Sequence, residues 1–164
     1  MSSADQPTFT HLDESGHARM VDVTLKQPTV RSATARGVVR CAPEVVTALR
    51  DGTVPKGDVL AVARISGIQA AKRTPELLPL AHVIGVHGAT VDLVVTDTGV
   101  EIEATVRTAD RTGVEMEALT AVSVAALAVV DMVKGLDKAT AIDDLRIVTK
   151  TGGKSGDWHR PGEA

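Results

Sequence analysis

The chain has 164 residues, 43% of them hydrophobic, which suits one domain over residues 1–164 and excludes a chain disordered throughout. Aromatic residues make up 1% and the net charge is −3, so neither base stacking nor global charge favours nucleic-acid binding. The lone Cys41 excludes an intrachain disulfide framework, and the N-terminus lacks a basic-then-apolar signal pattern. We therefore expect a cytoplasmic protein with no membrane segment.

The first half of the chain predicts a strand and two helices after a loose polar arm over residues 1–20. The β-branched run 34–39 indicates a strand. The first helix, over residues 43–52, begins with a proline and ends at a glycine. Asp58 can cap the second helix, which covers residues 59–72. The residues of the second helix expected to face inward are Leu60, Ala63, Ile65 and Ile68.

The second half predicts a hairpin, a long helix and a last strand. The hairpin consists of strands over 89–95 and 100–108, joined by a turn at 97–99. A last strand covers 145–148, and the polar, glycine-rich tail 150–164 is expected to be mobile. The apolar side of the second hairpin strand consists of Ile102, Ala104 and Val106.

This order of elements is the split β-α-β pattern with one extra helix. It predicts an α+β fold, in which a four-stranded antiparallel sheet carries helices on one face. The second face of such a sheet is open, and the apolar helix described next needs more cover than one small sheet supplies. Both features favour a homo-oligomer.

The helix predicted over residues 113–134 is apolar on every side. No charge interrupts it between Glu117 and Asp131, which indicates a buried helix or a subunit contact. Asp131 and Lys134 are three positions apart near its C-terminal end and therefore share one face. One interpretation is a solvated ion pair that caps the helix. The other is a carboxylate and an ammonium group that exchange protons with a substrate.

Several basic residues are candidates for an anion site if the fold brings them together. The alternative is that each is an ordinary solvated charge. The glycine-rich run over 152–155 invites comparison with a phosphate-binding P-loop, but the required glycine is missing at Val148 and no helix follows. We interpret the tail as a flap whose lysines fold over a phosphate. The basic candidates are Arg31, Lys56, Lys72, Arg73, Lys150 and Lys154.

Acidic residues and histidines suggest a second polar site. His82 and His87 with Glu115 and Glu117 could hold a metal, but their spacing matches no established ligand motif, so we predict neither a metal nor a cofactor. The two glutamates either stabilise the start of the apolar helix or accept hydrogen bonds from a polar heterocycle. The alternative for His82 is that it is a hydrogen-bonded loop residue and not a ligand.

Blocks along most of the chain, from about His11 to Asp157, resemble the molybdenum cofactor biosynthesis protein C family. Several blocks are long and specific, so chance similarity is improbable. The blocks are His11, Met20-Val21-Asp22-Val23, Lys56-Gly57-Asp58, the run from Gly67 to Thr74, Pro79-Leu80, the run from Thr112 to Thr120, and the run from Gly152 to Gly156.

The resemblance implies cyclic pyranopterin monophosphate synthase activity. Its substrate is 3′,8-cyclo-7,8-dihydroguanosine triphosphate, whose rearrangement yields a pyranopterin with a cyclic phosphate and releases diphosphate. The family also implies ferredoxin-like subunits in a homohexamer, a trimer of dimers, with active sites between subunits. No redox step is needed.

The resemblance also assigns roles to residues. It implies that Asp131 is catalytic, that Lys134 is its partner and that Lys56 is another active-site lysine. The substrate-binding residues that it implies are Leu80, Ala81 and His82 in one loop, Met116 and Glu117 at the start of the apolar helix, and the tail lysines Lys150 and Lys154.

One block departs from the family pattern. The family usually has Pro-Leu-Cys-His-Pro where this chain has Pro79-Leu80-Ala81-His82-Val83. No thiol is present at this position, and we expect the chemistry not to need one, because the acid–base residues are retained. The rival to the enzyme hypothesis is a non-catalytic ligand-binding or assembly module on the same fold. Release of diphosphate from the cyclised GTP substrate separates the two.

Overall fold

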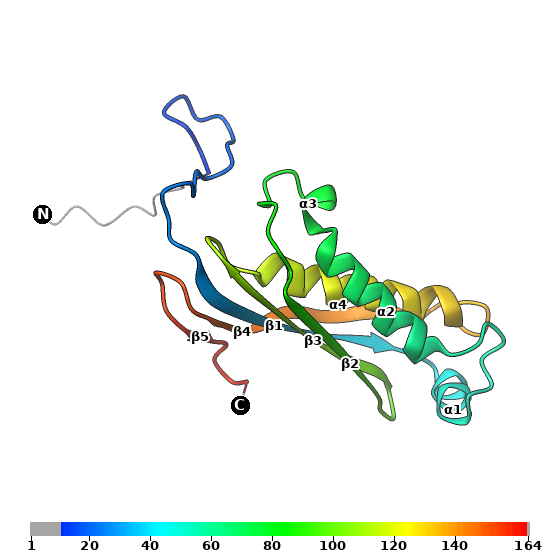
Figure 1. The fold of residues 1–164 in the computed structure, drawn as a ribbon. Coiled ribbons are helices and arrows are strands. Elements are labelled where there is room, and N and C mark those ends of the chain that lie inside the picture. The colour runs from blue at the N-terminus through cyan, green and yellow to red at the C-terminus, as the bar shows by residue number, and fades with distance from the viewer. Residues whose placement is uncertain (1–10, 164) are drawn as a thin grey trace, which may run out of the picture.

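The computed structural model describes residues 11–163 and shows one twisted antiparallel sheet with the helices on one side (Figure 1). The strand order is β2-β3-β1-β4-β5. The predicted α+β class and the one-sided helices are confirmed. In chain order the elements are β1 (Thr29–Arg40), α1 (Pro43–Asp51), α2 (Val59–Lys72), α3 (Thr74–Leu77), β2 (Gly88–Val95), β3 (Gly99–Asp110), α4 (Glu115–Val133), β4 (Ala141–Thr151) and β5 (Trp158–His159).

The sheet has five strands, one more than the sequence predicts. The additional strand, β5, has two residues, which pair with Thr149 and Lys150 of β4. The order of the four long strands is that of the split β-α-β fold. β1 begins at Thr29 instead of the predicted Thr34, and β4 begins at Ala141 instead of the predicted Leu145. Both strands start earlier because their pairing with neighbouring strands continues through polar residues that show no clear apolar alternation.

The hairpin alternates between the two faces of the sheet as predicted. Ile102, Ala104 and Val106 are buried on the helix side, whereas Glu101 and Arg107 are exposed. A strand with such alternation has one face on the core and one face toward solvent. The open second face of the sheet is therefore polar and charged.

Small residues let α4 lie close to both the sheet and α2. β1 presents Ala35 and Gly37 to the helix, and a Cβ atom at Gly37 would lie 2.8 Å from a methyl group of Val122. Gly67 of α2 meets α4 similarly, because its Cβ would lie 2.8 Å from the carbonyl oxygen of Ala121. Larger side chains at these two glycines would force the layers apart.

The long helix α4 is buried against the sheet and α2, although not on every side. Leu127 is 56% exposed, and Asp131 is also exposed near the end of the helix. The helix is long and apolar enough to cross a membrane, but more than half of its apolar window is buried inside the protein. We therefore interpret it as the core helix of the domain.

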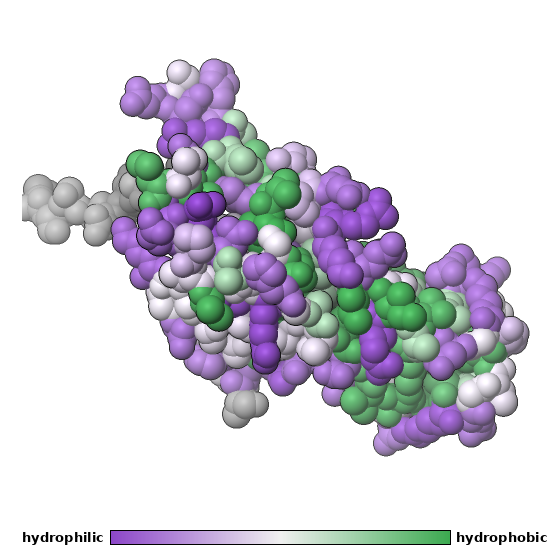
Figure 2. All heavy atoms as spheres, in the orientation of Figure 1, coloured by the Kyte–Doolittle hydropathy of each residue, from purple (hydrophilic) through white to green (hydrophobic). Residues whose placement is uncertain are grey.

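The expected inward face of α2 is partly wrong. Ala63 is fully buried, whereas Ile65 is 67% exposed, because α2 packs on α4 through its small residues. The exposed Val94 of β2 points to the open face of the sheet, where it lines a cavity with Arg36 and Glu103. Ile65 and Val62 instead lie on the exposed side of α2. Figure 2 shows apolar side chains gathered on this part of the molecule.

The N-terminal arm predicted over residues 1–20 is described only from residue 11 onward. Residues 11–19 form a turn that projects from the body (Figure 1), in which Asp13 accepts hydrogen bonds from the backbone of Ser15 and His17. At the other end, residues 158–163 lie along β4, although the sequence predicts a mobile tail there.

Candidate active site

Three predicted catalytic side chains meet at the C-terminal end of α4. The ammonium group of Lys134 lies 2.7 Å from one carboxylate oxygen of Asp131, and that of Lys56 lies 3.1 Å from the other. Lys56 also donates to the backbone carbonyl of Asp131 at 2.7 Å. All three side chains are about half exposed, at 46 to 59%. One carboxylate is thus shared by two ammonium groups on an accessible surface.

Local structure explains how this cluster forms. Asp131 and Lys134 are neighbours because they are three positions apart at the end of one helix. Lys56 comes from the turn before α2, where Gly57 has a positive φ of 101° and Asp58 caps the helix by accepting from the backbone of Ala61. Since α2 runs antiparallel to α4, its start lies beside the end of α4.

The electrostatics of the cluster favour an ionised carboxylate. Lys134 and then Lys56, by hydrogen bonds and by charge, hold the pKa of Asp131 below its ordinary value. A carboxylate of this kind does not donate a proton near neutral pH. Asp131 is therefore suited to orient the two lysines and to accept hydrogen bonds, while the ammonium groups are the proton donors.

A second group of predicted residues surrounds a cavity of about 450 Å³ at the N-terminal end of α4. It brings the loop containing His82 together with the first turn of α4, so two predicted substrate-binding segments share one wall. The lining residues are His11, Val21, Val23, Lys26, Leu80, Ala81, His82, Thr112, Gly113, Glu115, Met116 and Glu117.

His82 fastens the N-terminal segment to this cavity. Its Nε2 atom lies 2.6 Å from the carbonyl oxygen of Val21, and because a carbonyl only accepts, Nε2 is the donor. Arg111 holds the same segment from another side by donating to the carbonyl of Lys26 at 2.9 Å. These contacts explain why Val21, Val23 and Lys26 line the cavity, although the site predictions omitted them. In the sequence, the family-like block Met20–Val23 was the feature that could have indicated that this segment lines the site.

Glu117 is the buried acid of this cavity, with 3% of its surface exposed. Burial, and to a smaller extent the negative charge of Glu115, raise its pKa to about 6, while its own backbone N–H and His82 oppose the shift. A carboxyl group that titrates near neutral pH on a cavity wall can accept and return protons.

A smaller polar cavity of about 190 Å³ adjoins the first, since Gly113 and Glu115 line both. It receives Arg31 from β1 and Lys150 from β4, together with Ser155 of the following loop. Arg31 is held in place by donating to the carbonyls of Asp110 and Arg111 at 3.1 and 3.2 Å. This cavity is suited to an anionic group. Ser32, Thr151 and Gly152 complete its lining.

Other predicted residues do not join these cavities. Lys72 and Arg73 lie at the end of α2 and line neither of them, and Arg73 is paired with Glu76 at 2.8 Å. Lys154 is exposed in the loop after β4 and is likewise not a lining residue. Among residues 11–163, no three His, Cys, Asp or Glu side chains are grouped as a metal site. His87 instead accepts a hydrogen bond from the backbone of Ala109 at 3.0 Å.

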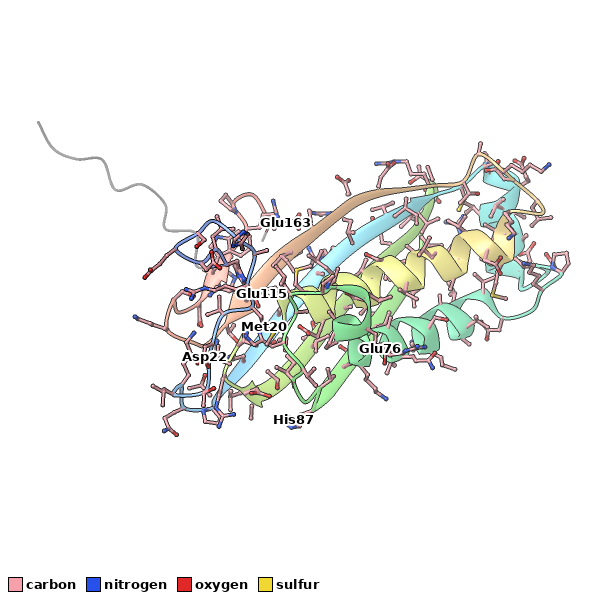
Figure 3. All side chains as sticks on the ribbon, turned by 90° about the horizontal axis from the view of Figure 1, so that it is seen from above. Met20, Asp22, Glu76, His87, Glu115 and Glu163 are labelled. Carbon is pink, nitrogen blue, oxygen red and sulfur yellow. The ribbon has the colours of Figure 1, made fainter. Side chains whose placement is uncertain are left out.

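The two clusters lie at opposite ends of α4. Met116 and Asp131 are 15 positions apart on this helix, and at 1.5 Å per residue their separation along its axis is about 22 Å. Figure 3 shows Met20, Asp22 and Glu115 at the end of the molecule away from α1. Within one chain, the lysine–aspartate cluster therefore does not face the cavities.

Glu117→Gln should change the pH dependence of activity. Because the pKa of Glu117 is raised to about 6, the parent carboxyl is protonated below this pH, and kcat/KM should fall as the pH drops through 6 if the ionised form binds substrate. The variant should lose this limb of the pH profile, with activity below that of the parent above pH 6 and no further fall below it.

The same shift predicts the effect on stability. The fold favours the protonated acid, so the contribution of Glu117 to stability decreases as the pH rises from about 4.5 to 6. Glu117→Gln should therefore melt no lower than the parent at pH 7.5. The control is Glu44→Gln in the exposed first turn of α1. A profile with an unchanged limb near pH 6 would exclude Glu117 as the titrating group.

Comparison with known proteins places the chain in one family. The model of the MoaC family matches residues 20–153. A cyclic pyranopterin monophosphate synthase of Streptomyces coelicolor is 60% identical over 169 residues, covering 98% of this chain and 99% of the relative. A protein of the same name from Nocardioides is 62% identical, and the match covers 96% of this chain and 99% of the relative. Cyclic pyranopterin monophosphate synthase 2 of Mycobacterium bovis is 53% identical, and the match covers 93% of this chain and 91% of the relative. The chain therefore belongs to the MoaC family.

Proposed function

We propose that this chain is a cyclic pyranopterin monophosphate synthase, a lyase of molybdenum cofactor biosynthesis that acts in the cytoplasm. The observation that carries the proposal is the convergence of Lys56 and Lys134 on Asp131, in a chain related along nearly its whole length to proteins of this name. Such a carboxylate–ammonium cluster supplies the hydrogen-bond acceptor and the proton donors that a purine rearrangement requires.

The cavities supply the binding functions. In the proposal, the larger cavity takes the purine-derived part of the cyclised GTP substrate, whose ring N–H and amino groups donate to Glu117 and Glu115. The adjoining polar cavity takes the triphosphate, which Arg31 and Lys150 bind by charge-assisted hydrogen bonds. Arg31 is already oriented by two backbone carbonyls, so little of its side-chain freedom is lost on binding.

The active site is proposed to form between copies of the chain. The cluster and the cavities of one chain are about 22 Å apart along α4, so a substrate in the cavity needs the cluster of a neighbouring copy. A second copy would also remove water from the half-exposed lysines and strengthen their charges. The assembly we propose is a homohexamer, a trimer of dimers.

The lysine–aspartate cluster then acts as one unit. Asp131 stays ionised and orients Lys56 and Lys134 toward the substrate. The ammonium groups donate protons to the rearranging ring or stabilise negative charge on the phosphate from which diphosphate departs. No step requires an electron donor or acceptor.

The test of the proposed function is direct. Purified protein is incubated with 3′,8-cyclo-7,8-dihydroguanosine triphosphate, and both diphosphate and the pyranopterin product are measured. Equal amounts of the two products are expected. Binding of the substrate without release of diphosphate would contradict the enzyme and favour a ligand-binding module.

The assembly is a separate expectation. Light scattering at micromolar concentration should give the mass of a hexamer, about six times 17.1 kDa. The physical reason is the exposed apolar side chains of Val62 and Ile65 on α2, together with the open face of the sheet, on which Val94 is exposed. A stable monomer would contradict both the assembly and the shared active site.

A further inference from the structure

The C-terminal residues 158–163 fold back along β4 and are held there by specific contacts. The backbone N–H of Arg160 donates to the carbonyl of Val148 at 2.8 Å, and its Nε donates to the carbonyl of Ile147 at 2.6 Å. The guanidinium of Arg160 also lies 5.6 Å from the centre of the Trp158 ring, within the range of a cation–π contact. This segment is attached to the edge of the sheet that β4 forms.

The end of the segment is fastened by one carboxylate. Glu163 lies between Arg36 of β1, 3.0 Å away, and Arg146 of β4, which contacts its other oxygen. Its side chain is only 15% exposed. Arg36 is itself oriented by Glu103 of β3 at 2.6 Å. The segment 158–163 is thus connected to three strands of the sheet, and Figure 3 labels Glu163.

The loop 152–157 connects the end of β4 to the anchored segment 158–163. It contains three glycines with positive φ angles of 67 to 80°. Its ends are joined by a hydrogen bond of 2.9 Å from the backbone of Gly152 to the carboxylate of Asp157. The ammonium group of Lys150 contacts the hydroxyl of Ser155, so a lysine of the polar cavity is oriented by the loop.

We propose that Glu163 is a positioning residue for the candidate active site. Bound to Arg36 and Arg146, it anchors the C-terminal segment and so keeps the loop 152–157 closed before the substrate arrives. The loop in turn holds Lys150 and Ser155 at the cavity that takes the polyphosphate. This inference rests on the proposed function for its ligand, although the anchoring itself does not.

The physical reason is the conformational freedom of glycine. Three glycines in six residues leave a free loop with many accessible conformations, and ordering it on binding lowers affinity. A loop fixed at both ends has already lost most of this freedom. The anchor should therefore strengthen substrate binding without altering the chemical step.

The anchor can be tested in the free protein with Glu163→Gln, which keeps the shape and removes the charge. Backbone amide exchange over residues 152–157 should become faster than in the parent. The matched control is Asp143→Asn, which removes another carboxylate–arginine pair between β1 and β4, 2.5 Å long and far from the loop. Unchanged exchange in Glu163→Gln, or the same change in the control, would overturn the proposal.

Kinetics provide the second readout. Glu163→Gln should raise the KM for the cyclised GTP substrate about three- to tenfold, the cost of ordering one or two side chains, with kcat within about twofold. A lower kcat at unchanged KM would contradict a positioning role. If the parent itself releases no diphosphate, the proposed function fails, whereas the exchange experiment still decides whether Glu163 anchors the loop.

Discussion

Replacement of Asp131 by asparagine should reduce diphosphate release by at least about two orders of magnitude, with the assembly and substrate binding intact. The substitution keeps the shape of the side chain and removes the charge that Lys134 and Lys56 share, at 2.7 and 3.1 Å. Because these lysines hold the pKa of Asp131 below its ordinary value, the parent carboxylate is ionised at neutral pH, and the variant loses the full charge.

Melting temperature, substrate affinity and diphosphate release should be measured on one preparation of Asp131→Asn. The matched control is Asp97→Asn, which removes an exposed ion pair of similar length, 2.7 Å, between Asp97 and Arg50. If Asp131 only caps its helix, both variants will behave alike, with a small change in melting temperature and nearly full activity. Activity of Asp131→Asn within a few-fold of the parent would show that Asp131 is not catalytic.

Lys56→Ala should also cause a severe loss of turnover, about 10²- to 10³-fold, because one of the two groups that donate to developing charge is removed. Folding should persist, since Lys56 is 46% exposed in a turn, and such residues contribute little to stability. The control is Lys138→Ala, an exposed lysine in the turn after α4. Near-normal turnover would identify Lys56 as an ordinary solvated charge.

The same variant can test whether the site is shared between copies. Lys56→Ala is defective in the cluster, whereas Lys150→Ala is defective in the polar cavity. When the two are unfolded and refolded together in equal amounts, about a quarter of the sites should combine an intact cluster with an intact cavity and regain activity. Each variant refolded alone is the control. No gain in the mixture would place both halves of the site in one chain.

Local chemistry accounts for the parts of the fold that the sequence predicts well. The helix from Val59 to Lys72 has the predicted bounds, because Asp58 caps its first turn and Pro75 disfavours continuation beyond its end. The alternation of Ile102 and Ala104 with charged residues likewise identifies the buried face of β3.

Other features of the fold depended on tertiary contacts. The strand β5 has only two residues and is paired because Arg160 and Glu163 attach the segment 158–163 to the sheet. Ile65 is exposed because α2 approaches α4 through Gly67, and close packing of backbones selects the small residues of a helix for its inner face. Neither feature has a local sequence signal.

The candidate site was likewise determined partly by the local sequence and partly by tertiary contacts. The sequence by itself determined that Asp131 and Lys134 share a helix face, since the helical repeat fixes the spacing of residues three apart. Only the tertiary structure decided that Lys56, 75 positions away, binds the same carboxylate, because this requires the antiparallel packing of α2 on α4. The meeting of Arg31 and Lys150 beside Glu115 likewise depends on the pairing of β1 with β4, which brings distant segments together.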